Sequence, residues 1–313
     1  MKYLIKKLIT LIITLLLVSA AAFTAFELIP GDSVTASLGT DYTEEAAEQL
    51  REELGLNRSL PERFFSWLWG AIRGDFGTSL QYRQPVSDLI ADRLSVTMWL
   101  AVLSMAFVVV ISIPLGILAA RFRGGIADRV ITLISQAAMA IPPFFLGILL
   151  TLVFGIMLSW FTPGAYVSIE QDPAGFFAYL IFPAVSVAIP KIAMTVKFLR
   201  SSVIRQMRLD YVRTARSKGN KESAVLIRHV LKNALIPVVT FLGMAAADVL
   251  AGSIIVEQVF GLPGIGRLLV VSISNRDYAV VQAIILYIAF AVVVINFLVD
   301  LLYQQLDPRV RLN

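Results

Sequence analysis

The sequence predicts an all-α integral membrane protein with six transmembrane helices. Of its 313 residues, 58% are hydrophobic and 16% are charged, and the mean hydropathy is +0.78. Soluble domains are less apolar, at roughly 45–50%, and about 25% of their residues are charged. Six stretches contain the roughly 20 mainly apolar residues that a spanning helix needs. They lie at about 8–29, 95–120, 130–160, 177–199, 235–256 and 279–303.

The first apolar stretch is predicted to be an uncleaved span, so that residues 1–29 form the N-terminus and the first helix. Lys2, Lys6 and Lys7 precede it, as basic residues precede a signal peptide. However, the apolar run continues to Ile29, which is longer than the 7–15-residue core of a signal peptide.

The distribution of positive charge predicts the orientation. Lys and Arg gather at the N-terminus, at 121–129, in the loop at about 200–234 and at the C-terminus, whereas acidic residues outnumber Arg in 30–93. We therefore expect both termini and the 200–234 loop in the cytoplasm. Residues 30–93 are expected outside, and 94–313 are expected to form the transmembrane core with the second to sixth spans.

Residues 30–93 predict a helical extracytoplasmic insert between the first two spans. Thr43 before a run of acidic residues is typical of a helix start, and Gly55 is typical of its end. A second, amphipathic helix follows Pro61, and 74–77 predicts a turn. Two interpretations stay open: a passive connection between spans, or a docking domain for a soluble partner.

The polar loop at about 200–234 predicts a short helix on the membrane surface. Tyr211, Ala215 and Gly219 are four residues apart and share one helix face, where small side chains would let another surface approach closely. Gly219 is expected to end this helix, and a second helix to run up to Pro237. The alternative is an ordinary basic loop held near anionic lipid.

The same loop resembles the EAA loop of ABC-transporter membrane subunits. That pattern is E-A-A, three residues, Gly, nine residues, then I-x-L-P. Arg213-Thr214-Ala215 stands at E-A-A, Gly219 at the Gly and Leu231 at the Leu. His229 and Lys232 replace Ile and Pro, and these departures resemble the branch that imports dipeptides, oligopeptides and nickel.

Further segments along the whole chain resemble the same branch, and the 30–93 insert resembles that of the first of its two paired permeases. The segments are Pro30-Gly31-Asp32, Leu54-Gly55-Leu56, Gly74-Asp75-Phe76-Gly77-Thr78-Ser79, Pro85-Val86, the run from Val256 to Arg267, Asn275-Arg276-Asp277-Tyr278 and Asp307-Pro308-Arg309-Val310-Arg311.

The resemblance implies a type I ABC importer fold in a prokaryotic cell membrane, with a second permease subunit, two ATPase subunits and an extracytoplasmic substrate-binding protein as partners. The chain has no G-x-x-x-x-G-K-S/T phosphate loop, so ATP and Mg²⁺ are expected on the ATPases. No cofactor, metal, catalytic residue or nucleic-acid partner is expected here, and lipid surrounds the chain. The residues expected to couple it to an ATPase are Asp210, Tyr211, Arg213, Thr214, Ala215, Lys218 and Gly219.

Two charges fall deep inside predicted spans. Lys191 and Asp248 would each cost about 2.5–3.5 kcal/mol at mid-span on insertion scales, so they are expected to line the pathway or to pair with each other. His229, the one histidine, is expected to pack beside the short helix rather than to bind a metal.

The leading function is a permease of an ATP-driven importer for dipeptides or oligopeptides. One alternative keeps the class and changes the cargo to nickel or a metal chelate. Another is an ion-coupled secondary transporter, for which internal repeats and broken helices around an ion site would be expected. An intramembrane enzyme would need a paired catalytic set, which Asp248 alone does not supply.

Overall fold

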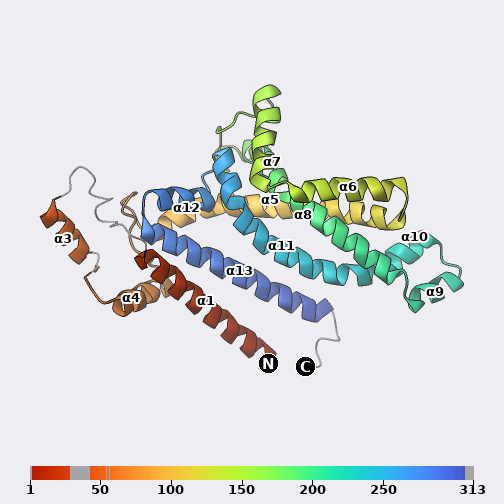
Figure 1. Cartoon of the computed structure of the whole chain (residues 1–313), viewed down its shortest axis with the longest axis horizontal. Helices are drawn as coiled ribbons and strands as arrows, with labels where there is room; N and C mark the ends of the chain where they lie inside the picture. The colour runs from red at the N-terminus through yellow and green to blue at the C-terminus, as the bar shows by residue number, and fades with distance from the viewer. Residues whose placement is uncertain (1, 29–42, 54, 56, 307–313) are drawn as a thin grey trace. The chain divides into compact units, whose positions relative to one another are not determined.

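The computed structural model describes residues 2–28, 43–53, 55 and 57–306 (Figure 1). Within these residues, five helices are long and apolar enough to cross a membrane. They lie in α1 (Lys2–Leu28), α5 (Val86–Arg121), α8 (Pro173–Gln206), the helical run Glu222–Phe260 and α13 (Tyr278–Leu306). The predicted all-α membrane fold is confirmed. The motifs Pro30-Gly31-Asp32 and Asp307-Pro308-Arg309-Val310-Arg311, and Leu54 and Leu56, fall outside the described residues.

The third apolar stretch, at about 130–160, is not one straight helix. α6 (Ile126–Ala140) is followed by α7 (Pro143–Leu150) and the π-helix η2 (Thr151–Met157), and the chain bends by 98° between them. Pro142 lacks an N–H and disfavours helical geometry at the preceding residue, so Ile141 is extended with φ −95° and ψ 123°. The stretch predicted as a span at 130–160 is therefore a broken span or a re-entrant pair.

One compact unit comprises residues 1–97 and 263–294. It contains α1, α3 (Glu44–Glu53), α4 (Leu60–Ile72), the start of α5, α12 (Ile265–Ser274) and the start of α13. The ring of Phe23 on α1 lies 5.5 Å from that of Phe64 and 6.0 Å from that of Trp67. Ser79 donates a hydrogen bond to the buried carboxylate of Asp277. The insert is thereby held against both α1 and the start of α13.

Both helices predicted within the insert are present. α3 starts after Thr43, whose hydroxyl accepts a hydrogen bond from the Ala46 N–H at 3.2 Å. α4 starts at Leu60, where the Glu62 carboxylate accepts from the Ser59 N–H at 3.1 Å. The predicted turn is also present, because Gly77 donates its N–H to Asp75 at 2.9 Å.

The other unit comprises residues 98–262 and 295–313. α8 is the most deeply buried of its candidate spans and packs against α6, α7 and α11 (Leu231–Phe260). α5 approaches α8 at Gly116, where an added Cβ would lie 2.9 Å from Leu199 Cδ2 and 3.0 Å from Leu199 Cβ. A glycine is therefore needed at this crossing for space rather than for backbone conformation.

We predict that Gly116→Ala lowers the melting temperature of the purified protein, although alanine is favoured over glycine within helices by roughly 0.5–1 kcal/mol. Overpacking a core costs typically about 1–3 kcal/mol. Gly252→Ala is the matched control, because a Cβ at Gly252 meets nothing within 4 Å. Equal shifts for the two variants would contradict the close crossing.

Candidate functional site

The short helix predicted in the polar loop at about 200–234 is present as α9 (Asp210–Ser217). Lys218 follows it, and the N–H of Gly219 donates to the carbonyl of Arg216 at 2.9 Å. Gly219 has φ +77°, in the left-handed region, and an added Cβ would meet nothing within 4 Å. The helix therefore ends where the sequence predicts, and Gly219 is required for its backbone conformation.

α9 has one apolar face, which is buried in the chain itself. Val212 and Ala215 are 0% and 6% exposed, and they lie three residues apart on that face. They belong to an apolar cluster under the helix, which we call the α9 base. Its other buried members are Leu199, Val203, Val225, Leu226, Val230, Ala234 and Val238.

The face of α9 that is open to a partner is polar. Asp210, Arg213, Thr214, Lys218 and Gly219 are all exposed. This differs from the expectation that the small side chain of Ala215 would admit another surface. Val212 and Ala215 form the apolar stripe of the helix, and burial of that stripe against α8 and α11 turns the charged residues outward.

Polar contacts fix α9 at both ends. At its start, the Tyr211 hydroxyl donates to Gln206 Oε1 at 2.9 Å, which ties α9 to the end of α8. At its end, Asn220 Nδ2 donates to the carbonyl of Ala215 at 2.9 Å. Arg216 also makes a bidentate ion pair with Glu222, with Nε–Oε1 and Nη2–Oε2 distances of 2.7 and 3.2 Å. The hydrogen bond to Glu222 raises the pKa of Arg216 above its usual value, so this arginine stays charged.

The second predicted helix runs directly into the next span. α10 (Glu222–Ala224), the π-helix η3 (Val225–Val230) and α11 follow one another without a break. Ser202 on α8 donates to the carbonyl of Ala234 on α11 at 2.9 Å. His229 is exposed, so the expectation that it packs beside α9 is wrong. Leu226 and Val230 fill that position instead, because the helix presents them, and not His229, to the α9 base.

The two deep charges lie together. Lys191 Nζ on α8 is 2.8 Å from Asp248 Oδ2 on α11. The Lys191 side chain is 19% exposed, but that of Asp248 is 63% exposed at the surface of this chain. A carboxylate facing lipid at mid-span would be costly, so this surface is expected to face water or another subunit.

A third ion pair was not anticipated from the sequence. Arg200 on α8 binds Asp128 on α6 through both prongs, at 2.5 and 2.7 Å, and the Gly124 N–H donates to the same carboxylate at 2.8 Å. The Asp128 side chain is 5% exposed. From the sequence, Arg200 contributed only to the positive charge that predicts the orientation, and its pairing with Asp128 was missed. The sequence did contain a signal for this pair. Asp128 is the one acid among three arginines, at 121, 123 and 129, at the start of an apolar stretch.

Residues 112–312 match the family described as the binding-protein-dependent transport system inner membrane component, and residues 1–101 match the N-terminal family of the same membrane components. The chain belongs to this family of inner membrane permeases, which have the type I importer fold. It is a multi-pass membrane protein and not an enzyme; ATP hydrolysis resides on separate subunits.

Full-length relatives agree with this class. The chain is 39% identical over 311 residues to the glutathione transport system permease protein GsiC of Pectobacterium atrosepticum, with 99% of each chain covered. It is 38% identical over 309 residues to the probable peptide ABC transporter permease protein y4tP of Sinorhizobium fredii, again with 99% of each covered. A putative peptide transport system permease protein of Brucella abortus is 38% identical over 307 residues, with 98% of each covered.

We predict that Gly219→Val reduces ATP-dependent uptake more than Gly219→Asn. A β-branched residue at positive φ costs about 1–3 kcal/mol, whereas Asn enters this region more readily. The strain would displace the end of α9 without changing which cargo is preferred. Uptake and ATP hydrolysis by proteoliposomes measure the effect. Equal activity of the two variants would refute a conformational role for this glycine.

The Lys191–Asp248 pair yields a second prediction. Asp248→Ala should lower the melting temperature by roughly 2–4 °C, because the ammonium of Lys191 loses its partner. Removing both charges, in Lys191→Met/Asp248→Ala, should restore stability but not transport. Recovery of transport as well would reduce the pair to a structural bridge. Unchanged stability and unchanged transport in Asp248→Ala would exclude both roles.

Proposed function

We propose that this chain forms one half of the translocation pathway of an ATP-driven importer that takes up peptides from an extracytoplasmic binding protein. A second permease would supply the other half, and two ATPases would bind in the cytoplasm. The observation that carries the proposal is α9. It is an exposed polar helix fixed to the ends of two spans, in a chain without a phosphate loop of its own.

The exposed face of α9 suits docking into a groove of an ATPase. Arg213, Thr214 and Lys218 project from it and can make polar contacts across the interface. The opposite face cannot slide independently, because Val212 and Ala215 are buried in the α9 base. Closure of the ATPase pair would therefore push α9 together with the cytoplasmic ends of α8 and α11.

The same two helices carry the charge pair at mid-span. Lys191 lies on α8 and Asp248 on α11, so a displacement that begins at α9 reaches both. We place the exposed carboxylate of Asp248 on the pathway or at the contact with the second permease. Tilting of α8 and α11 would then change access to this region, as alternating access requires.

The orientation follows from the basic loop. Arg205, Arg208, Arg213 and Lys218 are exposed around α9, which favours the cytoplasmic side for this loop and for both termini. Residues 30–93 would then be outside, where the binding protein delivers its cargo.

Peptides are the favoured cargo because the similar permeases are described as carriers of peptides or of glutathione, which is a tripeptide. Nickel or a metal chelate remains the alternative of the same class. The binding protein is expected to select between them, so the cargo has to be measured with that partner present.

Purification from the native membrane tests the proposal. We expect the chain to carry with it a second permease and two ATPases. Proteoliposomes of this complex, given the binding protein and ATP, should take up labelled di- to tetrapeptides but not nickel ions. A lone chain that transports without ATP would refute the class, and ATP-dependent nickel uptake alone would refute the cargo.

A charge-reversal pair tests the coupling surface in the same preparation. Arg213→Glu/Lys218→Glu should reduce the amount of ATPase recovered with the permease. Arg123→Glu, which reverses an exposed arginine on the other cytoplasmic connection, is the control and should recover it normally.

A further inference from the structure

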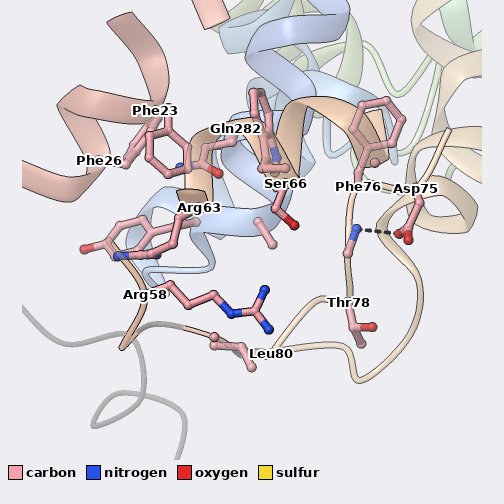
Figure 2. Close-up of a pocket in the computed structure, with 16 residues that line it drawn as sticks. Phe23, Phe26, Arg58, Arg63, Ser66, Asp75, Phe76, Thr78, Leu80 and Gln282 are labelled. Atoms are coloured by element: carbon pink, nitrogen blue, oxygen red, sulfur yellow. Dashed lines mark hydrogen bonds between the residues drawn. The ribbon is translucent and has the colours of Figure 1, made fainter. Parts of the chain in front are cut away.

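A pocket of about 350 Å³ lies in the unit formed by residues 1–97 and 263–294 (Figure 2). Its wall is made by the end of α1, one side of α4, the segment from Asp75 to Leu80 and the first turn of α13. Ligand sites typically take about 300–1,000 Å³, so this one suits a small polar group. Neither α9 nor the Lys191–Asp248 pair takes part in it.

The charges of the wall favour an anion. They are Arg58, Arg63 and Asp75, and the Asp75 carboxylate already accepts a hydrogen bond from the Gly77 N–H at 2.9 Å. Figure 2 shows the Arg58 side chain extending across the pocket, with the hydroxyl of Ser66 directed into the same space. A guanidinium and a hydroxyl that face one space are suited to the oxygens of a phosphate.

The apolar part of the wall lies at the end of a candidate span. Phe23 and Phe26 are in the last turn of the span Lys7–Phe26, and Trp67 packs on Phe23. The ring of Phe26 lies 5.6 Å from that of Tyr278. Trp and Tyr are enriched at the level of lipid headgroups, so Trp67 and Tyr278 favour that level for the pocket.

The outer side of α4 supports this depth. Phe65, Trp69 and Ile72 share one face and are 65%, 57% and 69% exposed, whereas Arg63 and Ser66 face the pocket. The Arg73 guanidinium lies 4.4 Å from the centroid of the Trp69 ring. A helix of 13 residues is too short to span a bilayer. An exposed apolar face on such a helix is typical of one that lies in the membrane interface.

We propose that this pocket binds an anionic phospholipid, with the phosphate held by Arg58 and Ser66 and the acyl chains leaving along Phe23 and Phe26. Trp67 Nε1 and the Tyr278 hydroxyl are buried and have no hydrogen-bond partner among the described residues. An unsatisfied buried donor is destabilising, and a headgroup oxygen would supply an acceptor after a small ring rotation. The lipid would tie α1, α4 and the start of α13 together.

Free phosphate and a peptide carboxylate share the anionic chemistry but lack the paired acyl chains that the aromatic wall fits. The test therefore compares phosphatidylglycerol with phosphatidylcholine on the purified importer complex, by native mass spectrometry. We expect phosphatidylglycerol to be retained preferentially and to resist competition by millimolar inorganic phosphate.

Single substitutions at exposed arginines give the matched comparison, since neither side chain is buried. Arg58→Gln should weaken phosphatidylglycerol retention about tenfold, as loss of a charge-assisted hydrogen bond implies. Arg58→Lys should keep most of it. Arg73→Gln, which removes an arginine outside the pocket wall, should change it little.

Four outcomes would overturn the proposal. Equal retention of phosphatidylglycerol by Arg58→Gln and the unchanged protein would show that Arg58 does not bind the lipid. Displacement of the lipid by inorganic phosphate would show a site for small anions. A higher KM for peptide uptake by Arg58→Gln in vesicles of pure phosphatidylcholine would make the anion a part of the cargo. Weaker docking of the binding protein to Arg58→Gln in lipid-free detergent would make the surface a protein interface.

Discussion

Burial of the α9 base is the interaction on which the position of α9 against α8 and α11 depends. Burial of the apolar side chains of Val212 and Ala215 is favourable. They pack against Leu199 and Val203 of α8 and Ala234 of α11. At about 25 cal/mol per Å² of apolar area, such burial stabilises α9 more than the exposed ion pair that accompanies it. The base includes side chains of α8 and α11, so α9 is packed against both long helices.

α8 connects the remaining features of its unit. It carries Leu199 in the α9 base, Arg200 in the pair with Asp128 and Lys191 in the pair with Asp248. It also approaches α5 so closely that Gly116 cannot carry a side chain without a shift. Close packing against α6, α7 and α11 would pass a displacement of one end of α8 to these neighbours.

The insert combines aromatic packing on one side of α4 with an exposed apolar face on the other. Phe23, Phe64 and Trp67 hold α4 against α1, while the opposite side of α4 exposes Phe65 and Trp69. These two sides explain why a short amphipathic helix is kept outside the spans. Its inner face lines the pocket, and the apolar outer face is compatible with lipid.

By itself, the sequence determined what depends on local chemistry. The lengths of the apolar runs located the spans, and Thr43 predicted the start of α3. Gly219 predicted the end of α9, because the backbone there has a left-handed conformation that favours glycine. The motifs also identified the permease class, which the family match confirmed. The apolar length of 130–160 predicted one span, and it did not reveal the 98° bend between α6 and α7.

Only the tertiary structure decided which surfaces meet. Ala215 is buried inside the chain rather than open to a partner. Lys191 pairs with Asp248, 57 residues away in the sequence, and Asp128 pairs with Arg200, 72 residues away. Periodicity places a residue on a helix face, but it does not say which neighbour that face will cover. That choice depends on how long helices cross, which is set by many contacts between residues that are distant in the chain.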